Sequence, residues 1–308
     1  MPPICCGAFF VDGVSFLKMA TAVFVRPLLT VCFSSRSPRA ISPCPYKPVR
    51  HFMNWLRRQP VSVTVSLSFV LLLLLWQLLV LVGAYDKFIL PGPLDVARQF
   101  GVVVKDGRLL RHSLITISEV IPGLLIGASI SLPLGYLLAK SPLAERLISP
   151  YLIASQAIPV IAIAPLLTIW IRSTFWARVL VAVLVVFFPV LINIIAGLRS
   201  VPRELYELMA SLQATRWQIF RKLEWPAALP IVLAGLKLGA TLSVIGALVG
   251  EFVQPKTEGL GYLLVTARYQ FKTDLVFVVL FTLAAIALSL YGLVTVAEKR
   301  LLRWQVNQ

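Results

Sequence analysis

Six apolar stretches divide the chain, and each has the length that a helix needs to cross a bilayer. They are predicted at residues 61–82, 114–139, 151–171, 179–198, 231–249 and 275–296. About 20 predominantly apolar residues in a helix span the roughly 30 Å hydrocarbon core. A short surface helix is also expected at residues 95–101, after the turn Pro91-Gly92-Pro93. The pattern therefore predicts an all-α, polytopic membrane protein with six transmembrane helices.

The longest polar segment between two apolar stretches, residues 201–230, has the spacing of short amphipathic helices. Charged and apolar side chains alternate along it at roughly helical period, as Glu204 and Leu208 illustrate. Pro226 and Pro230 are expected to end the helices that precede them. On physical grounds the segment is either a solvated connector or a surface offered to a soluble partner.

The composition excludes a soluble globular domain. Of 308 residues, 58% are hydrophobic and only 14% are charged, and the mean hydropathy is +0.87. The formal net charge of +16 would suit a nucleic-acid-binding protein. However, the basic residues are scattered at the ends of the apolar stretches and in loops, without a basic face. No nucleic-acid partner is therefore expected.

Six crossings place both termini on one side of the membrane. A modest excess of Lys and Arg favours the cytoplasm for both termini and for the 201–230 loop. The chain is expected to divide into three parts. They are residues 1–52, a poorly structured or mis-assigned N-terminal extension, residues 53–112, the first transmembrane helix with an external segment, and residues 113–308, the transmembrane core.

Three polar residues inside the apolar stretches are candidates for a translocation pathway: Glu119, Gln156 and Asn193. An ionisable group in a span costs roughly 2.5–3.5 kcal/mol on insertion scales, so Glu119 should face the bundle interior or water. The alternative is a carboxylate near the external end of its helix that pairs with a basic neighbour. Gln156 and Asn193 also have a simpler interpretation, because polar groups in spans often only join helices.

The fifth apolar stretch carries two pairs of glycines, each pair four residues apart on one helix face: Gly235/Gly239 and Gly246/Gly250. Such faces let helix backbones approach closely, so tight packing is predicted here. Glu251 follows at the outer end of this stretch. It is expected to belong either to a charged rim that contacts an external protein or to a solvated turn.

The sequence holds no recognisable catalytic or metal-binding motif. A phosphate-binding loop needs Gly, four residues and then Gly-Lys-Ser/Thr, and Lys140-Ser141 lacks both glycines. The cysteines precede the first apolar stretch and lack metal-ligand spacing. They are Cys5, Cys6, Cys32 and Cys44. The chain is therefore expected to bind no cofactor or metal and not to be an enzyme.

The 201–230 loop resembles the cytoplasmic loop of ABC-importer permeases, whose pattern is Glu-Ala-Ala, three residues, Gly, nine residues and Ile-x-Leu-Pro. Glu207 takes the place of the Glu, Gln213 that of the Gly, and Leu223-Glu224-Trp225-Pro226 ends the pattern. Since Gly would permit a positive φ, Gln213 implies either ordinary dihedrals or an accepted strain. The resemblance runs from about residue 90 to residue 304, includes Gly259-Leu260-Gly261-Tyr262, and is specific to the nitrate/sulfonate/taurine-like branch.

This resemblance implies a homodimer that works with two ATP-binding subunits in the cytoplasm and an external solute-binding protein. ATP would be bound by the partner subunits, whose closure would push on the loop and switch the passage between two states. The glycine faces would pack beside the passage at a two-fold axis. The residues implied in coupling to the ATPase are Glu204, Glu207, Gln213, Arg216 and Trp217.

The resemblance also indicates a class of substrate. Residues 214–222 and 249–253 look like those of permeases for riboflavin or for the pyrimidine precursor of thiamine. A vitamin or vitamin precursor is therefore the expected solute. One alternative is the same machinery for nitrate, sulfonate, taurine or bicarbonate. Another is a self-contained secondary transporter, which commonly needs an internal repeat that this sequence does not show.

Overall fold

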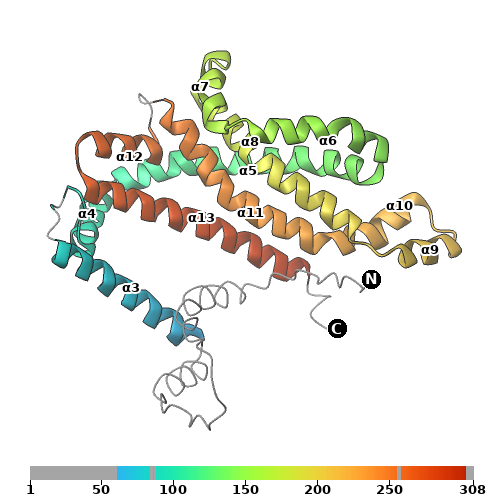
Figure 1. The fold of residues 1–308 in the computed structure, drawn as a ribbon, viewed down its shortest axis with the longest axis horizontal. Helices are drawn as coiled ribbons and strands as arrows, with labels where there is room; N and C mark the ends of the chain where they lie inside the picture. The colour runs from blue at the N-terminus through green and yellow to red at the C-terminus, as the bar shows by residue number, and fades with distance from the viewer. Residues whose placement is uncertain (1–60, 84–85, 87, 255–257, 303–308) are drawn as a thin grey trace, which may run out of the picture. The chain divides into compact units, whose positions relative to one another are not determined.

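The computed structural model describes residues 61–83, 86, 88–254 and 258–302 of the chain (Figure 1). Within these residues the regular structure is helical and no β-strand occurs. The all-α class predicted from the apolar pattern is therefore confirmed. The expected N-terminal extension, residues 1–52, and the four cysteines lie outside the described residues.

In the described part of the chain, five helices are long and apolar enough to cross a membrane. They are α3 (Val61–Gly83), α5 (Arg108–Lys140), α8 (Thr174–Arg199), α11 (Trp225–Phe252) and α13 (Thr273–Leu301). Each contains one of the predicted apolar stretches.

The span predicted at residues 151–171 is interrupted at Pro159. Two helices, α6 (Pro142–Ala157) and α7 (Val160–Trp170), meet there at an angle of 94°. Ile158 and Pro159 between them are extended, with ψ of 120° and 119°. Proline offers no N–H and disfavours helical dihedrals at the residue before it, so the helix ends there. If the bent pair counts as one broken span, the candidate spans number six.

Prolines elsewhere leave their helices intact. Helix α10 (Arg216–Ile219), a π-helical turn (Phe220–Glu224) and α11 follow one another without a break. The expectation that Pro226 ends a helix is therefore wrong, and Pro230 lies inside α11. The N–H of Trp225 donates to the carbonyl of Phe220, five residues earlier, and Pro226 follows directly as the second residue of α11.

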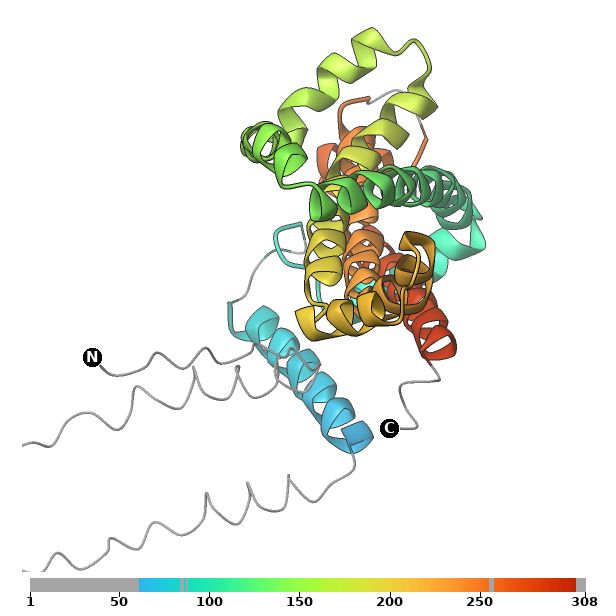
Figure 2. The ribbon, with the colours of Figure 1, turned by 90° about the vertical axis from the view of Figure 1, so that its right-hand side faces the viewer.

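Helices α8 and α11 pack against each other along most of their length (Figures 1 and 2). The glycines of α11 make this possible, because a Cβ on any of them would overlap an atom of α8. The residues of α8 that face Gly235, Gly239, Gly246 and Gly250 are, in that order, Asn193, Val190, Ala182 and Arg178. For Gly246 the added Cβ would lie 2.6 Å from the Cα of Ala182. The predicted close packing is confirmed.

The two ends of this helix bundle carry different short helices (Figure 1). We call the end with α9 (Arg203–Ser211) and α10 the loop end. We call the other end, where α5 begins and α12 (Leu260–Tyr269) lies, the distal end. The surface helix expected at residues 95–101 is present at the distal end as the longer α4 (Pro93–Lys105).

Candidate functional site

The loop end presents a surface of exposed apolar and charged side chains. Leu208 and Leu212 are 55% and 67% exposed, and Trp217 is also 67% exposed. Exposed apolar patches of this kind mark surfaces that a partner covers. The five residues that sequence predicted for coupling all lie here, on α9, on the turn after it or on α10: Glu204, Glu207, Gln213, Arg216 and Trp217. We call this the loop surface.

The turn between α9 and α10 is built around a residue in the left-handed region. Gln213 has φ +51°, so of the two expectations for this position the accepted strain is confirmed and ordinary dihedrals are wrong. The N–H of Gln213 donates to Ala210 and that of Ala214 to Met209, the two bonds of a Schellman ending. Thr215 and Gln218 then form a capping box that starts α10. Local bonds thus fix the angle between the two helices.

One lysine connects α9 to the spanning helices. Nζ of Lys140, the last residue of α5, donates to Oη of Tyr206 at 3.1 Å and lies 4.8 Å from the centre of its ring. The same Nζ forms an ion pair with Glu224, the last residue of the π-helical turn. The Glu224 side chain is only 4% exposed. Three segments that are distant in sequence therefore meet at Lys140.

A pocket of about 490 Å³ lies between the bent pair α6–α7 and helices α8 and α11. Gln156 and Asn193, two of the three residues predicted for the pathway, line it together with Phe188 and Leu238. The amide of Asn193 donates through Nδ2 to the carbonyl of Pro189 at 2.8 Å. No Lys or Arg is among the described residues that line the pocket. The wall is thus mainly apolar and aromatic, and its polar side chains are the two amides and the hydroxyl of Ser155.

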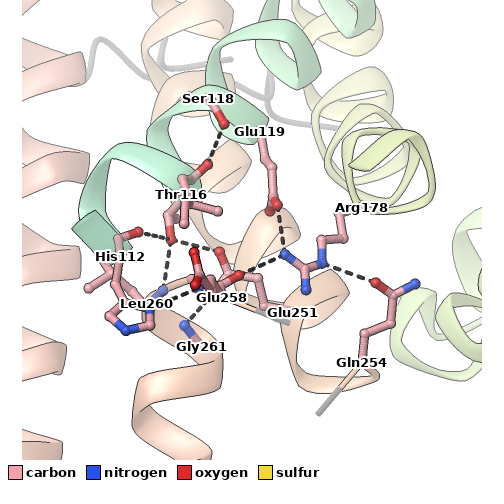
Figure 3. A network of polar contacts seen from close by, with 12 residues as sticks. His112, Thr116, Ser118, Glu119, Arg178, Glu251, Gln254, Glu258, Leu260 and Gly261 are labelled. Atoms are coloured by element: carbon pink, nitrogen blue, oxygen red, sulfur yellow. Dashed lines mark hydrogen bonds and ion pairs between the residues drawn. The ribbon is translucent and has the colours of Figure 1, made fainter. Parts of the chain in front are cut away.

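Glu119, the third predicted pathway residue, is not part of this pocket. It lies near the distal end, where its Oε1 accepts a 2.8 Å bond from Nη1 of Arg178. Both side chains are almost fully buried, at 2% and 3% exposed. Arg178 also donates to Gln254 at 3.2 Å and to the carbonyl of Glu258 at 3.0 Å (Figure 3). The geometry thus matches the alternative in which Glu119 pairs with a basic neighbour.

Glu251 is buried, which corrects the expectation of an exposed rim or a solvated turn. Its side chain receives a 2.6 Å bond from Oγ1 of Thr116 and a bond from the N–H of Gly261 (Figure 3). Thr116 in turn accepts from the N–H of Leu260 at 2.9 Å, and His112 accepts on Nδ1 from Gly259 at 3.0 Å. The first amides of α12 are therefore capped by side chains of α5 and α11, where a carboxylate also suits the helix dipole.

The glycines of the Gly259-Leu260-Gly261 stretch make room for this carboxylate. Gly259 has φ +143°, and a Cβ there would overlap the Glu251 carboxyl group. A Cβ on Gly261 would lie 2.8 Å from Glu251 Oε2. The glycines that carried part of the family resemblance thus have a local physical role.

Sequence reasoning missed several residues of these clusters. They are His112, Thr116, Lys140, Arg178 and Lys237. Lys237 lies inside the predicted stretch 231–249 and forms a 2.5 Å ion pair with Glu298 of α13. A lysine within an apolar stretch was the available signal, because such a charge requires a partner. For Arg178 the signal was its place at the start of an apolar stretch.

These features together define a class of protein. A bundle of helices long enough to span a membrane, with a pocket among them and an exposed helical loop at one end, suits a subunit of a membrane transporter. The family model of the binding-protein-dependent transport system inner membrane component matches residues 131–303. The chain belongs to this family, that of the multi-pass permease subunits of ABC importers, in which the ATPase is a separate subunit.

Curated relatives extend the match over most of the chain. The riboflavin transport system permease protein RibX of Chloroflexus aurantiacus is 44% identical over 246 residues, which is 80% of this chain and 91% of that protein. The formylaminopyrimidine transport permease protein ThiX of Halalkalibacterium halodurans is 32% identical over 254 residues, 82% of this chain and all of that protein. A structure of the MetNI methionine ABC transporter in an inward-facing conformation shares the fold, with a TM-score of 0.54, 22% identity, and coverage of 64% of this chain and 95% of that chain.

Proposed function

We propose that this permease imports riboflavin or a pyrimidine precursor of thiamine. The observation that carries the proposal is the 44% identity to a riboflavin permease over 80% of this chain. The 32% identity to a formylaminopyrimidine permease indicates the same chemical class. Both named solutes contain a nitrogen heteroaromatic ring, which stacks on aromatic side chains and exchanges hydrogen bonds with amides.

The pocket between α6–α7, α8 and α11 suits such a solute. Its volume of about 490 Å³ lies within the usual range for small-molecule sites. Phe188 and the neighbouring apolar residues offer surface to a ring, and Gln156 and Asn193 offer amide donors and acceptors. An oxyanion such as nitrate or a sulfonate would instead favour Arg or Lys, and the described lining has neither. Gln156 and Asn193 are therefore proposed to border the passage.

The loop surface is proposed as the contact with the ATPase. Its exposed Leu208 and Leu212 can enter an apolar groove, while Glu204 and Glu207 lie beside them on α9. We propose an assembly of two copies of this chain, two ATP-binding subunits and an external solute-binding protein. In that assembly the loop end and both termini face the cytoplasm, and the distal end faces the binding protein.

Uptake of labelled riboflavin tests the proposal. The chain is expressed with its ATPase and its solute-binding protein in cells that lack their own riboflavin import. We expect saturable uptake that disappears when the ATPase carries an inactivated ATP site. Because that control keeps all subunits present, the loss reports ATP use rather than failed assembly.

Two results would contradict the proposal. Uptake that persists with the inactive ATPase would favour a secondary transporter. An assembled complex that takes up nitrate or a sulfonate, but neither riboflavin nor the pyrimidine precursor, would overturn the substrate class and leave the importer mechanism intact.

A further inference from the structure

Helix α9 has little packing of its own against the bundle. Among its residues only Tyr206 and Met209 are partly buried, and all the others are exposed. Its side-chain bond to another helix in the described chain is the one from Lys140 to the Tyr206 hydroxyl. Among the described residues, Lys140 therefore makes the side-chain bond that joins α9 to α5.

The chain connects α9 directly to only two of the spanning helices. Residues 200–202 join it to α8, and α10 with the π-helical turn joins it to α11. Helices α5 and α6 precede both in sequence and have no such covalent link to the loop. Lys140 supplies a non-covalent link through its bonds to Tyr206 and Glu224. It ends α5 and is followed by Ser141, whose side chain caps α6.

The elements that meet at Lys140 lead to both walls of the central pocket. From Ser141, α6 runs to Ser155 and Gln156 on one wall. From Glu224, α11 runs to Leu238 and Leu242 on the other. A displacement of α9 that moves Lys140 and Glu224 would therefore act on the two walls at once, since packed helices move as rigid elements.

We propose that Lys140 transmits movement of α9 to α5 and α6. It acts as a positioning residue: it holds Tyr206 with its hydroxyl bond and ring contact, and holds Glu224 with its charge. This inference rests on the proposed contact between the loop surface and the ATPase. It adds a route to the passage that the chain connectivity does not provide.

The bonding at Glu224 makes the link sensitive to substitution. The carboxylate is buried, Oε1 is bonded to Lys140, and Oε2 has no hydrogen-bond partner among the described residues. Loss of Lys140 would therefore leave a buried charge without compensation, which strongly destabilises the local structure. A test has to separate this effect from the loss of transmission.

The experiment uses the complete complex in liposomes, with ATPase and solute-binding protein, and labelled riboflavin as the probe. Four quantities are measured: uptake, ATP hydrolysis, stimulation of hydrolysis by the binding protein, and the amount of ATPase retained on purification. Lys140→Met removes the link, and Lys140→Arg preserves the charge and the donors. In Lys140→Met/Glu224→Gln the uncompensated charge is absent, but the link to Tyr206 is still missing.

We expect Lys140→Met and the double variant to retain the ATPase, because neither replaces an exposed residue of α9 or α10. Riboflavin uptake per ATP and stimulation by the binding protein should both fall at least about fivefold, the lower end of typical coupling between sites. Lys140→Arg should recover most of both. Lys299→Met is the matched control, because this exposed lysine in the last turn of α13 has no ion pair within the described residues. It should behave as wild type.

Normal uptake per ATP in the double variant would overturn the proposal. In that case Lys140 would matter only because its charge compensates the buried Glu224 carboxylate. Release of the ATPase by Lys140→Met would also contradict it, because the residue would then shape the docking surface. Failure of the wild-type complex to take up riboflavin would instead count against the proposed substrate. The stimulation of ATP hydrolysis by the binding protein, compared between wild type and the Lys140 variants, would still test the role of Lys140.

Discussion

Replacement of Arg178 by methionine should destabilise the distal end of the bundle more than any change to an exposed arginine. Methionine keeps much of the stem that packs against Gly250, but it removes the guanidinium. The structure loses bonds to Glu119 at 2.8 Å, to the carbonyl of Glu258 at 3.0 Å and to Gln254 at 3.2 Å. What remains is a buried carboxylate without its cation.

The size of the effect follows from burial. Glu119 and Arg178 are 2% and 3% exposed, so solvent cannot replace the lost partner. Breaking a buried ion pair by removing one partner costs about 3–5 kcal/mol, whereas an exposed pair contributes about 0–1 kcal/mol. At about 2–4 °C per kcal/mol for a domain of this size, the unfolding midpoint should fall by about 6–20 °C.

Thermal unfolding of the purified protein in detergent measures this shift, with Arg172→Met as the control. Arg172 is exposed and has no ion pair within the described chain, so its loss should change the midpoint little. In Arg178→Met/Glu119→Gln no charge of this pair remains buried, so the double variant should be more stable than Arg178→Met. A midpoint for Arg178→Met within 2 °C of the control would refute the reasoning, as would a double variant less stable than Arg178→Met.

Three further substitutions probe the turn, the α12 cap and the pocket. Gln213→Gly should raise the unfolding midpoint, because a residue other than glycine in the left-handed region costs about 1–2 kcal/mol. A lower midpoint would show that the Gln213 side chain stabilises the folded protein by more than this strain destabilises it. Gly259→Ala should lower the midpoint markedly, since φ is +143° and the new Cβ would overlap the Glu251 carboxyl, whereas Gly292→Ala, with open space around it, should not. Gln156→Leu should raise the KM for riboflavin uptake about fivefold and leave the amount of retained ATPase unchanged. A fivefold change corresponds to the loss of one hydrogen bond of about 1 kcal/mol between Gln156 and the solute. An unchanged KM would place Gln156 outside the passage.

The spanning helices could be predicted from sequence because the bilayer imposes a length and an apolar composition. The loop helices could be predicted because their apolar residues recur at helical period. That Gln156 and Asn193 line one pocket could be predicted in part, since polar residues in apolar stretches tend to face the bundle interior. In each case the signal is local along the chain.

The remaining features depend on contacts between distant residues. Pro159 breaks its helix whereas Pro189 lies inside α8, and nothing in either proline itself distinguishes them. Glu251 was expected near water because it ends an apolar stretch, but its partner Thr116 is 135 residues away in sequence. Lys140 was considered only as part of an incomplete phosphate-binding motif. Its role as a connection depends on Tyr206 and Glu224, which lie beside it in space but are distant in sequence.

The capping of α12 has a consequence for how the protein is made. The amides at the start of this helix need acceptors from His112 and Thr116 of α5 and from Glu251 of α11. A nascent chain that has inserted α5 cannot close this cap until α11 has been synthesised and has packed beside it. Helix α12 should therefore become ordered late during biogenesis, and its bonds to α5 and α11 then stabilise the packing of these earlier helices. Substitutions at Gly259 or Glu251 would then reduce the yield of assembled protein before they affect transport.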